Sequence, residues 1–391
     1  MTAPIRFNPY DAAFDADPFP VYRQLREAAP CFWSDDARMW VLTRYDDIFR
    51  ALGDWRTYSS SRGNLMDEFP GRAGNTLGSM DPPRHDRVRG IISAVFAKQN
   101  LEHLEQPIRD LARGAIASLG DARHIDFTND FSARVTVGLL SALFDLPAHD
   151  YRELRDTAVM MVQSDPATRQ KGPQHIAAYE WMKAYAGRIL EQRREKPGAD
   201  LVTQLLQAEV DGARLTHDEV QLTVTTLIMA GVESLSGFLN MFALNLADFP
   251  DSRRQLVANP ALIPDAFEES LRYNTTAQRF RRVLQRDVEL HGQTMKAGDF
   301  VALCYGSGNR DDRKFPDADR YDIARRPKGH LGFGGGVHAC LGSMIARLAT
   351  RLVMEEFLAA IPEFGRADPQ LGWVPSSTFR SPLKLILQRA D

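Results

Sequence analysis

The stretch His330-Leu-Gly-Phe-Gly-Gly-Gly-Val-His-Ala-Cys340-Leu-Gly342 decides the fold of this chain of 391 residues. It contains one cysteine, and five glycines fall among the eleven residues from Gly332 to Gly342. Glycine allows positive φ and lets a backbone pass close to a flat group. A helical pattern follows, and the free N–H groups at a helix start stabilise a nearby thiolate. The stretch therefore predicts a glycine-rich loop that presents an ionised cysteine.

Three interpretations of this loop compete. A stabilised thiolate in such a loop suits an axial ligand of haem iron. Gly334-x-Gly336-x-x-Ala339 also fits the dinucleotide-binding fingerprint, which needs a strand before it and a second strand ending in an acid about 20 residues on. Instead, Pro327-Lys328-Gly329 precedes the loop and helical periodicity continues through Glu356, which argues against a nucleotide. The third interpretation is a buried thiol that acts as a small hydrophobic side chain.

A second stretch, Met80-Asp-Pro-Pro-Arg-His-Asp-Arg-Val-Arg89, predicts the start of a helix. Asp81 suits the N-cap position and Pro82 suits the first helical turn. His85 and Arg89 are four residues apart and share one helix face. Two donors on one face can hold a carboxylate, although an exposed basic face is the ordinary alternative.

A third stretch, from Val220 to Leu246, has the apolar pattern of a helix buried in the core. Its polar residues are expected to prevent it from spanning a membrane. Ala230-Gly-Val-Glu233-Ser234 lies within it, and a glycine there costs roughly 1 kcal/mol relative to alanine, which marks a close approach or a local opening. An acid beside a hydroxyl is a functional candidate because burying charge is costly. The alternative is a serine bonded to its own helix and a glutamate that reaches solvent.

A fourth stretch, Ala266-Phe-Glu-Glu269-Ser-Leu-Arg272, also has a helical pattern. Glu269 and Arg272 are three residues apart and share one helix face. Such a pair is ordinarily a surface salt bridge worth less than about 1 kcal/mol.

The composition is ordinary for a soluble globular protein, with 44% hydrophobic and 25% charged residues. A net charge of −3 gives no reason to expect nucleic acid or an anionic membrane as a partner. The start of the chain has no apolar leader. The two cysteines outside the loop, Cys31 and Cys304, lie in apolar segments and are expected to be buried thiols. So few cysteines favour the reducing cytoplasm.

Together, the four stretches resemble the cytochrome P450 family. The loop matches its haem-binding signature, and the others resemble its Asp-Pro-Pro-x-His-x-x-x-Arg, small-Gly-x-acid-alcohol and Glu-x-x-Arg patterns. Since the resemblance covers nearly the whole chain, it implies a single haem-thiolate domain over residues 1–391. The implied fold is mainly α with small β-sheets, a triangular prism-like helical domain. Haem lies there between the long central helix and the helix after the cysteine loop.

The resemblance implies haem b (iron protoporphyrin IX) as cofactor and Cys340 as the axial ligand of its iron. The implied cofactor-binding residues are His85, Arg89, Arg282, Phe333, Gly334, His338, Cys340 and Gly342, with Arg281 as the near alternative to Arg282. Gly231, Glu233 and Ser234 would form the oxygen-activating motif, in which serine replaces the commoner threonine. Glu269 and Arg272 would form a structural ion pair that Arg320 or Arg325 completes.

The activity implied by the resemblance is that of a monooxygenase that inserts one atom of O2 into a small hydrophobic organic substrate by hydroxylation or O-dealkylation. Electrons would come from NAD(P)H through a separate ferredoxin reductase and ferredoxin. A haem-thiolate peroxygenase or isomerase, which needs no redox partner, is the alternative. A basic docking patch is predicted at Arg84, Arg87, Lys98, Arg325, Arg326 and Lys328.

The substrate is predicted only as an aromatic acid or a terpenoid. Ser59-Ser-Ser-Arg62-Gly63 loosely resembles a loop of bacterial relatives that oxidise para-substituted aromatic acids, and Arg62 could meet a carboxylate. An arginine at the surface or holding the backbone is the alternative. The predicted pocket residues are Arg62, Leu65, Met229, Ala230, Thr276 and Phe379.

Overall fold

The computed structural model of the chain describes residues 5–96, 102–147, 150–165, 167–168 and 170–390. Its helices are α1 (Ala12–Ala16), α2 (Phe19–Ala28), α3 (Tyr45–Gly53), α4 (Arg84–Val95), α5 (Glu105–Leu119), α6 (Ala133–Phe144), α7 (Tyr151–Val162), α8 (Pro173–Glu195), α9 (Leu201–Gln207), α10 (His217–Asp248), α11 (Pro250–Ala258), α12 (Ile263–Tyr273), α13 (Tyr305–Gly308) and α14 (Ser343–Ala360). Shorter helical turns are η2 (Glu102–Leu104), η3 (Phe127–Ser132, a π-helix), η5 (Pro260–Leu262), η6 (Leu331–Phe333) and η7 (Gly336–His338). The strands are β1 (Cys31–Ser34), β2 (Met39–Leu42), β3 (Tyr58–Ser59), β4 (His124–Asp126), β5 (Glu209–Val210), β6 (Ala213–Arg214), β7 (Phe280–Leu284), β8 (Val288–Leu290), β9 (Gln293–Met295), β10 (Phe300–Leu303), β11 (Phe364–Arg366) and β12 (Ile386–Arg389).

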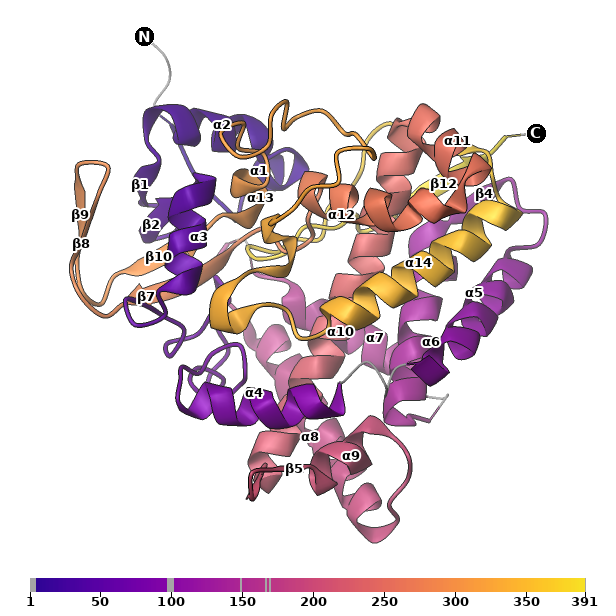
Figure 1. Ribbon diagram of the computed structural model, residues 1–391, viewed down its shortest axis with the longest axis horizontal. Helices are drawn as coiled ribbons and strands as arrows, with labels where there is room; N and C mark the ends of the chain where they lie inside the picture. Colours follow the sequence, from indigo (N-terminus) through magenta and orange to yellow (C-terminus); the bar gives the residue numbers. More distant parts are fainter. Residues whose placement is uncertain (1–4, 97–101, 148–149, 166, 169, 391) are drawn as a thin grey trace.

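The helices and the largest sheet occupy different parts of a triangular outline (Figure 1). The five-stranded sheet has the order β1-β2-β10-β7-β3 and lies beside α2 and α3. It combines an antiparallel β1–β2 hairpin with a parallel pairing of β2 and β10. Most of the helices fill the remainder of the outline, and α10 runs through its middle. This is the predicted mainly α fold with small sheets.

The central helix α10 has 32 residues and a strong start signal. The Thr216 hydroxyl accepts a hydrogen bond from the Glu219 N–H at 3.2 Å, and the Glu219 carboxylate accepts from the Thr216 N–H at 3.0 Å. This reciprocal capping satisfies two N–H groups that the helix itself leaves free. Among the described helices, α10 is long and apolar enough to cross a membrane, so the expectation that its polar residues would prevent this was wrong. However, 72% of its most apolar 18-residue window is buried in the protein, as expected of a core helix.

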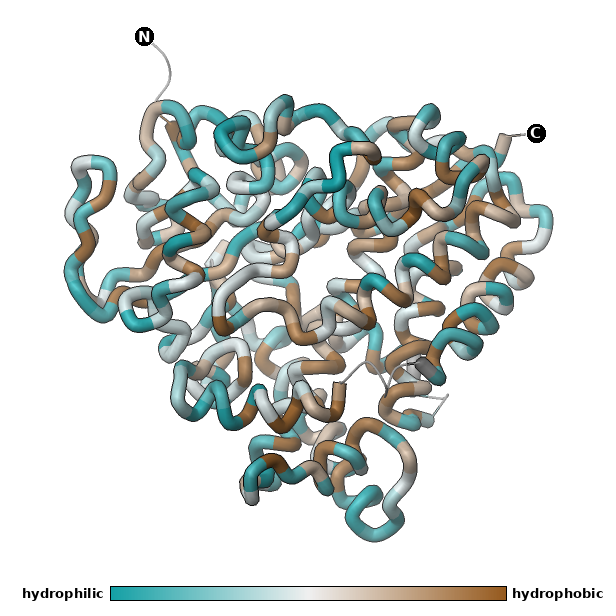
Figure 2. Tube along the Cα trace, in the orientation of Figure 1, coloured by the Kyte–Doolittle hydropathy of each residue, from teal (hydrophilic) through white to brown (hydrophobic). Residues whose placement is uncertain are grey.

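Two hydrophobic clusters meet along α10. Its first part, from Val220 to Val232, packs with α4, α6, α7, α8 and α9, whereas its later part, from Phe238 to Leu246, packs with α5, α12 and α14. In Figure 2, hydrophobic residues recur along these inner helices and many outer turns are hydrophilic, as amphipathic helices around a shared core require. Glu233 and Ser234 therefore lie where one cluster gives way to the other.

The predicted helix start at Asp81 was placed two residues too early. Helix α4 begins at Arg84, with Pro83 at the N-cap position. The Asp81 carboxylate instead accepts hydrogen bonds from the Ser60 N–H at 3.0 Å and from the Ser59 hydroxyl. A tertiary contact with β3 therefore takes the side chain that the local pattern had assigned to capping.

We predict that Phe242→Ala will lower the free energy of unfolding by about 3–5 kcal/mol, because it leaves a cavity in a packed core. Phe242 is fully buried on α10. Guanidinium unfolding followed by circular dichroism measures the change. Phe49→Ala is the matched control, since Phe49 is 55% exposed and its replacement should cost less than about 1 kcal/mol. Equal losses from the two replacements would contradict the packing described above.

Candidate active site

The cysteine loop is fixed by its own backbone and by α3. The Cys340 N–H donates to the Phe333 carbonyl at 2.8 Å, which closes the loop just before α14. Gly336 has φ +61°, and a Cβ on it would lie 2.0 Å from the Leu52 carbonyl oxygen of α3. No other residue fits there, because the backbone conformation and the close approach both require glycine. Gly334 has φ +65° as well.

The thiol of Cys340 is accessible at the end of the glycine-rich loop. Its side chain is exposed, yet burial is the largest influence on the pKa of the thiol and raises it. A hydrogen bond from the Gly342 backbone and the charges of Arg89 and Arg347 act in the opposite direction. A Cβ added to Gly342 would meet no atom within 4 Å. The loop therefore offers an accessible sulfur beside open space, which suits a bulky flat ligand.

The middle of α10 also has an accessible face. Ala230 is exposed although the adjoining Met229 is buried, and Ser234, one turn further along this face, is only partly buried. Gly231 allows a close approach of α6, because a Cβ there would lie 2.8 Å from a methyl carbon of Leu140. Among the described residues, the Ser234 hydroxyl has no hydrogen bond to its own helix, unlike Thr225, which donates to the Gln221 carbonyl. Ser234 is therefore free to bond a ligand or water.

Glu233 does not reach solvent. It is 5% exposed, and it accepts a hydrogen bond from the Ser381 hydroxyl at 2.8 Å. Burial raises its pKa to about 7, while Ser381 and the more distant Arg155 lower it. The carboxyl is thus poised to exchange a proton near neutral pH. Ser381 was missed in the sequence because it lies 148 residues from its partner.

His85 and His338 form a buried pair that has spare hydrogen-bonding capacity. Their rings contact edge to face with centroids 4.7 Å apart. Among the described residues, Nε2 of His85 and both ring nitrogens of His338 have no hydrogen-bond partner. The Asp81 carboxylate lies 3.8 Å from Nε2 of His338, too far for a hydrogen bond. Since buried polar atoms are normally paired, these nitrogens fit a polar ligand group such as a propionate.

Two arginines, Arg89 and Arg282, act on the sulfur and on the histidine pair. Burial lowers the pKa of Arg89 on α4, and the Cys340 sulfur acts to raise it, which places the two groups in each other's field. Burial lowers the pKa of His338 and raises that of Tyr305, and Arg282 on β7, which is 4% exposed, acts to lower both. Arg282 donates to the Arg281 carbonyl at 2.8 Å, whereas Arg281 donates to the Met66 carbonyl at 3.1 Å, and the charges that act on it are those of Glu68, Asp67, Tyr10 and Arg62. The geometry therefore favours Arg282 over Arg281.

Within the cysteine loop, the ring of Phe333 contacts Phe267 and Arg347, two residues that the sequence analysis did not single out. Its ring lies 6.0 Å from that of Phe267 on α12 and 4.6 Å from the guanidinium of Arg347 on α14. Arg347 donates to Glu268 at 2.5 Å, and Nε2 of His330 lies 2.7 Å from the same carboxylate. This cluster ties α12, the cysteine loop and α14 together.

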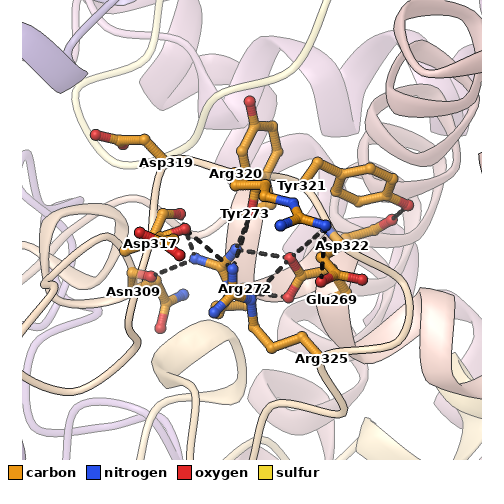
Figure 3. Close-up of polar contacts among 12 residues, drawn as sticks. Glu269, Arg272, Tyr273, Asn309, Asp317, Asp319, Arg320, Tyr321, Asp322 and Arg325 are labelled. Atoms are coloured by element: carbon orange, nitrogen blue, oxygen red, sulfur yellow. Dashed lines mark hydrogen bonds and ion pairs between the residues drawn. The ribbon is translucent and has the colours of Figure 1, made fainter.

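The pair Glu269–Arg272 is wholly buried, with both side chains 0% exposed. Arg272 donates to Glu269 at 2.7 and 2.8 Å and to the Asn309 and Ala318 carbonyls at 2.9 and 2.7 Å (Figure 3). Of the two arginines proposed to complete the pair, Arg325 does so at 3.2 Å. The side chain of Arg320 instead pairs with Asp322 at the surface.

The predicted pocket residues fall into two groups. Leu65 and Met229 belong to the buried cluster around the first part of α10, and Phe379 packs against it. Thr276 is 5% exposed and lies beside Gly237 of α10. Arg62, in contrast, is exposed, and its guanidinium lies 5.0 Å from the ring of Phe300. Phe300 belongs to the packing of a different cluster, near the N-terminal helices, so Arg62 lies apart from the apolar residues.

The predicted basic docking patch is wrong at one residue, Arg325, which is committed to the buried pair with a side chain that is 14% exposed. Arg84, Arg326 and Lys328 are exposed, and Arg326 pairs with Asp265. Arg84 and the partly exposed Arg87 both pair with Glu219 at the start of α10. Docking at these residues stays a prediction. Lys98 lies outside the described residues.

These features define a class of protein. In the described ranges, no three His, Cys, Asp or Glu side chains gather as a site for a free metal ion. One accessible sulfur instead lies beside the open space at Gly342 and near unpaired nitrogen donors. That donor set fits a haem whose iron Cys340 would bind and whose propionates His85, His338, Arg89 and Arg282 would hold. The fold and the site are those of a haem-thiolate protein.

Comparison with known proteins gives the family. The family model for cytochrome P450 matches residues 157–360. Nocardicin C N-oxygenase from Nocardia uniformis subsp. tsuyamanensis is 32% identical over 97% of this chain and 98% of its own length. Mycinamicin IV hydroxylase/epoxidase from Micromonospora griseorubida is 33% identical over 93% and 94%. The structure of cytochrome P450 CYP109Q5 from Chondromyces apiculatus, 28% identical, superposes with a TM-score of 0.89 over 99% of this chain and 98% of that one.

The chain therefore belongs to the cytochrome P450 family. It is a haem b enzyme of the monooxygenase class EC 1.14, as its relatives are, and its fold is the P450 fold. The predicted family, fold class and cofactor are thereby confirmed, and the nucleotide-binding interpretation of the glycine loop was wrong.

We predict that Glu269→Ala will lower the free energy of unfolding by about 3–5 kcal/mol, because it leaves the Arg272 charge buried and unpaired. Denaturant unfolding and haem retention on a desalting column measure the effect. Arg320→Ala serves as control, since its side chain is 71% exposed and should change stability by no more than about 0.5 kcal/mol. A stable, haem-retaining Glu269→Ala protein would contradict the structural role.

We also predict that Cys340→Ser will remove the thiolate-type Soret band of the ferrous carbon monoxide complex, because a hydroxyl cannot supply a thiolate to the iron. Absorption spectroscopy of haem-loaded protein measures this. Cys31→Ala, at a buried thiol of β1, should leave the band in place. Survival of the band in Cys340→Ser would show that another residue holds the iron.

Proposed function

We propose that this P450 hydroxylates or O-dealkylates a small hydrophobic organic substrate with O2, using electrons from NAD(P)H that reach it through a separate ferredoxin reductase and ferredoxin. One oxygen atom enters the substrate and the other leaves as water, with two electrons and two protons consumed. The buried acid Glu233 beside the accessible hydroxyl of Ser234 is the observation that carries this proposal. Residues 1–391 would act as one catalytic unit.

When bound, the haem supplies the oxygen chemistry, and the protein supplies orientation and protons. His85, His338, Arg89 and Arg282 would bind the propionates, and Cys340 would bind the iron. Glu233 exchanges a proton near pH 7, because burial raises its pKa to about 7. Ser234, which is only partly buried, would pass that proton on. General acid catalysis by a positioned carboxyl requires this match of pKa and operating pH.

The predicted substrate-binding residues favour a neutral substrate. Leu65, Met229 and Phe379 are apolar and packed together, whereas Arg62, the cation expected to read a carboxylate, faces the surface beside Phe300. We therefore favour a terpenoid-like substrate over an aromatic acid. The relatives fit a broad hydrophobic range, since solved structures of CYP109E1 from Bacillus megaterium hold testosterone or corticosterone.

A ligand screen tests this preference. Neutral terpenoids should shift the ferric spin state at lower concentration than carboxylic acids of the same size, because the acids would lose solvation without gaining a cation. Arg62→Ala should leave the binding of both classes unchanged. Tighter binding of acids, weakened by Arg62→Ala, would reverse the assignment.

We propose an external ferredoxin in the cytoplasm as the electron donor, as the resemblance of the sequence motifs to the family implies. Purified enzyme should oxidise its substrate with NAD(P)H, reductase and ferredoxin, and much more slowly with hydrogen peroxide alone. Full-rate turnover with peroxide alone, or rearrangement of the substrate without any oxidant, would point instead to a peroxygenase or an isomerase.

We predict that Arg326→Glu/Lys328→Glu will slow ferredoxin-driven turnover about tenfold at low salt, because reversed charge repels an acidic partner. Peroxide-driven turnover should be unaffected. Arg152→Glu is the control, at a side chain of α7 that is 94% exposed, and should change neither rate. Equal slowing by peroxide, or by the control, would exclude docking at these two residues.

A further inference from the structure

One contact between the C-terminal segment and the central helix α10 is made by Ser381. The Ser381 hydroxyl donates to Oε1 of Glu233 at 2.8 Å. Gly237 lies one helical turn beyond Glu233, and a Cβ on it would lie 3.0 Å from the Cβ of Ser381. Because residues four apart share a helix face, the missing side chain at Gly237 makes the room in which Ser381 reaches the carboxyl.

Ser381 is held in place independently of Glu233. The Arg380 N–H donates to the Thr276 carbonyl at 2.8 Å, and the Gln278 N–H donates to the Thr378 carbonyl at 3.1 Å. The Ser381 carbonyl accepts from the Val374 N–H at 3.0 Å. Backbone bonds on both sides therefore fix the serine, and its hydroxyl is a stationary partner for a carboxyl on a different element.

A hydroxyl is an unusual partner for a buried acid because it serves both protonation states. It donates to a carboxylate and accepts from a protonated carboxyl, whereas a lysine or arginine would hold the group ionised. Among the residues that the structure describes, the charged side chain with a resolved influence on the pKa of Glu233 is Arg155 of α7. Ser234 lies about 100° around the helix from Glu233, at 3.6 residues per turn. The hydroxyl of Ser381 therefore holds the acid on its own face of α10.

We propose that Ser381 is a positioning residue for proton delivery: its hydroxyl keeps the Glu233 carboxyl hydrogen-bonded in both protonation states, so the carboxyl takes up and releases protons without losing its place. This rests on the proposed role of Glu233 in the reaction. The C-terminal segment thereby acts on the central helix through Ser381, while Phe379 of the same segment packs against the hydrophobic cluster around the first part of α10.

Infrared spectroscopy of the haem-loaded ferric protein tests the proposal without turnover. The carbonyl stretch of protonated Glu233 is isolated as the difference between the native protein and Glu233→Gln, and it is followed against pH. Ser381 lowers the pKa of Glu233 while burial raises it, so Ser381→Ala should move the midpoint upward by about one pH unit, as expected for one lost bond to a carboxylate. An unchanged or lower midpoint overturns the proposal.

Two further variants separate positioning from general damage to the segment. Ser377→Ala removes a hydroxyl that donates to Asp67 at 2.8 Å in the same segment, and it should leave the midpoint in place. Gly237→Ala keeps the Ser381 hydroxyl but crowds it away from Glu233, and it should raise the midpoint as Ser381→Ala does. A shift from Ser377→Ala as large as that from Ser381→Ala would mean that the segment as a whole is disturbed.

The pH dependence of turnover provides a second test of the proposal. The descending limb of the pH profile should move upward in Ser381→Ala by the same interval as the infrared midpoint. A moved midpoint with an unmoved pH profile would show that Ser381 holds Glu233 but that Glu233 does not limit proton delivery, which overturns the proposal. A native enzyme that binds haem but never oxidises a substrate with O2 would instead remove the proposed function and leave the infrared result standing.

Discussion

The buried contact between Glu269 and Arg272 is the constraint on which the site depends. Removing two charges from water is costly unless both are fully hydrogen-bonded, and here both side chains are 0% exposed. Arg272 offsets this desolvation cost because it donates hydrogen bonds to the carbonyls of Asn309 and Ala318 as well as to Glu269. The pair therefore fastens α12 to the irregular segment that leads into the cysteine loop (Figure 3).

From this ion pair, a series of hydrogen bonds leads to the backbone of Cys340. The side chain of Asn309 accepts a hydrogen bond from the Leu331 N–H at 2.6 Å, and Leu331 begins the turn that carries Phe333. The Phe333 carbonyl in turn receives the Cys340 N–H. Each link fixes the next, so the position of the sulfur follows from a charge pair on another helix. A loose pair would leave the glycines of the loop without a defined shape.

The central helix α10 positions Glu233 and Ser234. The helix belongs to two hydrophobic clusters, and Glu233 and Ser234 lie between the parts that each cluster covers. An acid there is desolvated by protein on all sides, which raises its pKa. Proton exchange near pH 7 is thus a consequence of where the helix is packed. Ser381 then decides how the carboxyl is held.

The amino-acid sequence by itself determined the family, the fold class and the cofactor, and it predicts Cys340 as the haem ligand, because these rest on local patterns: glycines in a loop, a cysteine before a helix, and residues three or four apart on one face. It misplaced the helix start at Asp81, counted Arg325 among the surface charges and did not find Ser381. Each of these depends on a partner far along the chain, such as Ser60 for Asp81, Glu269 for Arg325 and Glu233 for Ser381. Only the tertiary structure decided them, since spacing along a chain says which residues share a helix face but not which distant group that face will meet.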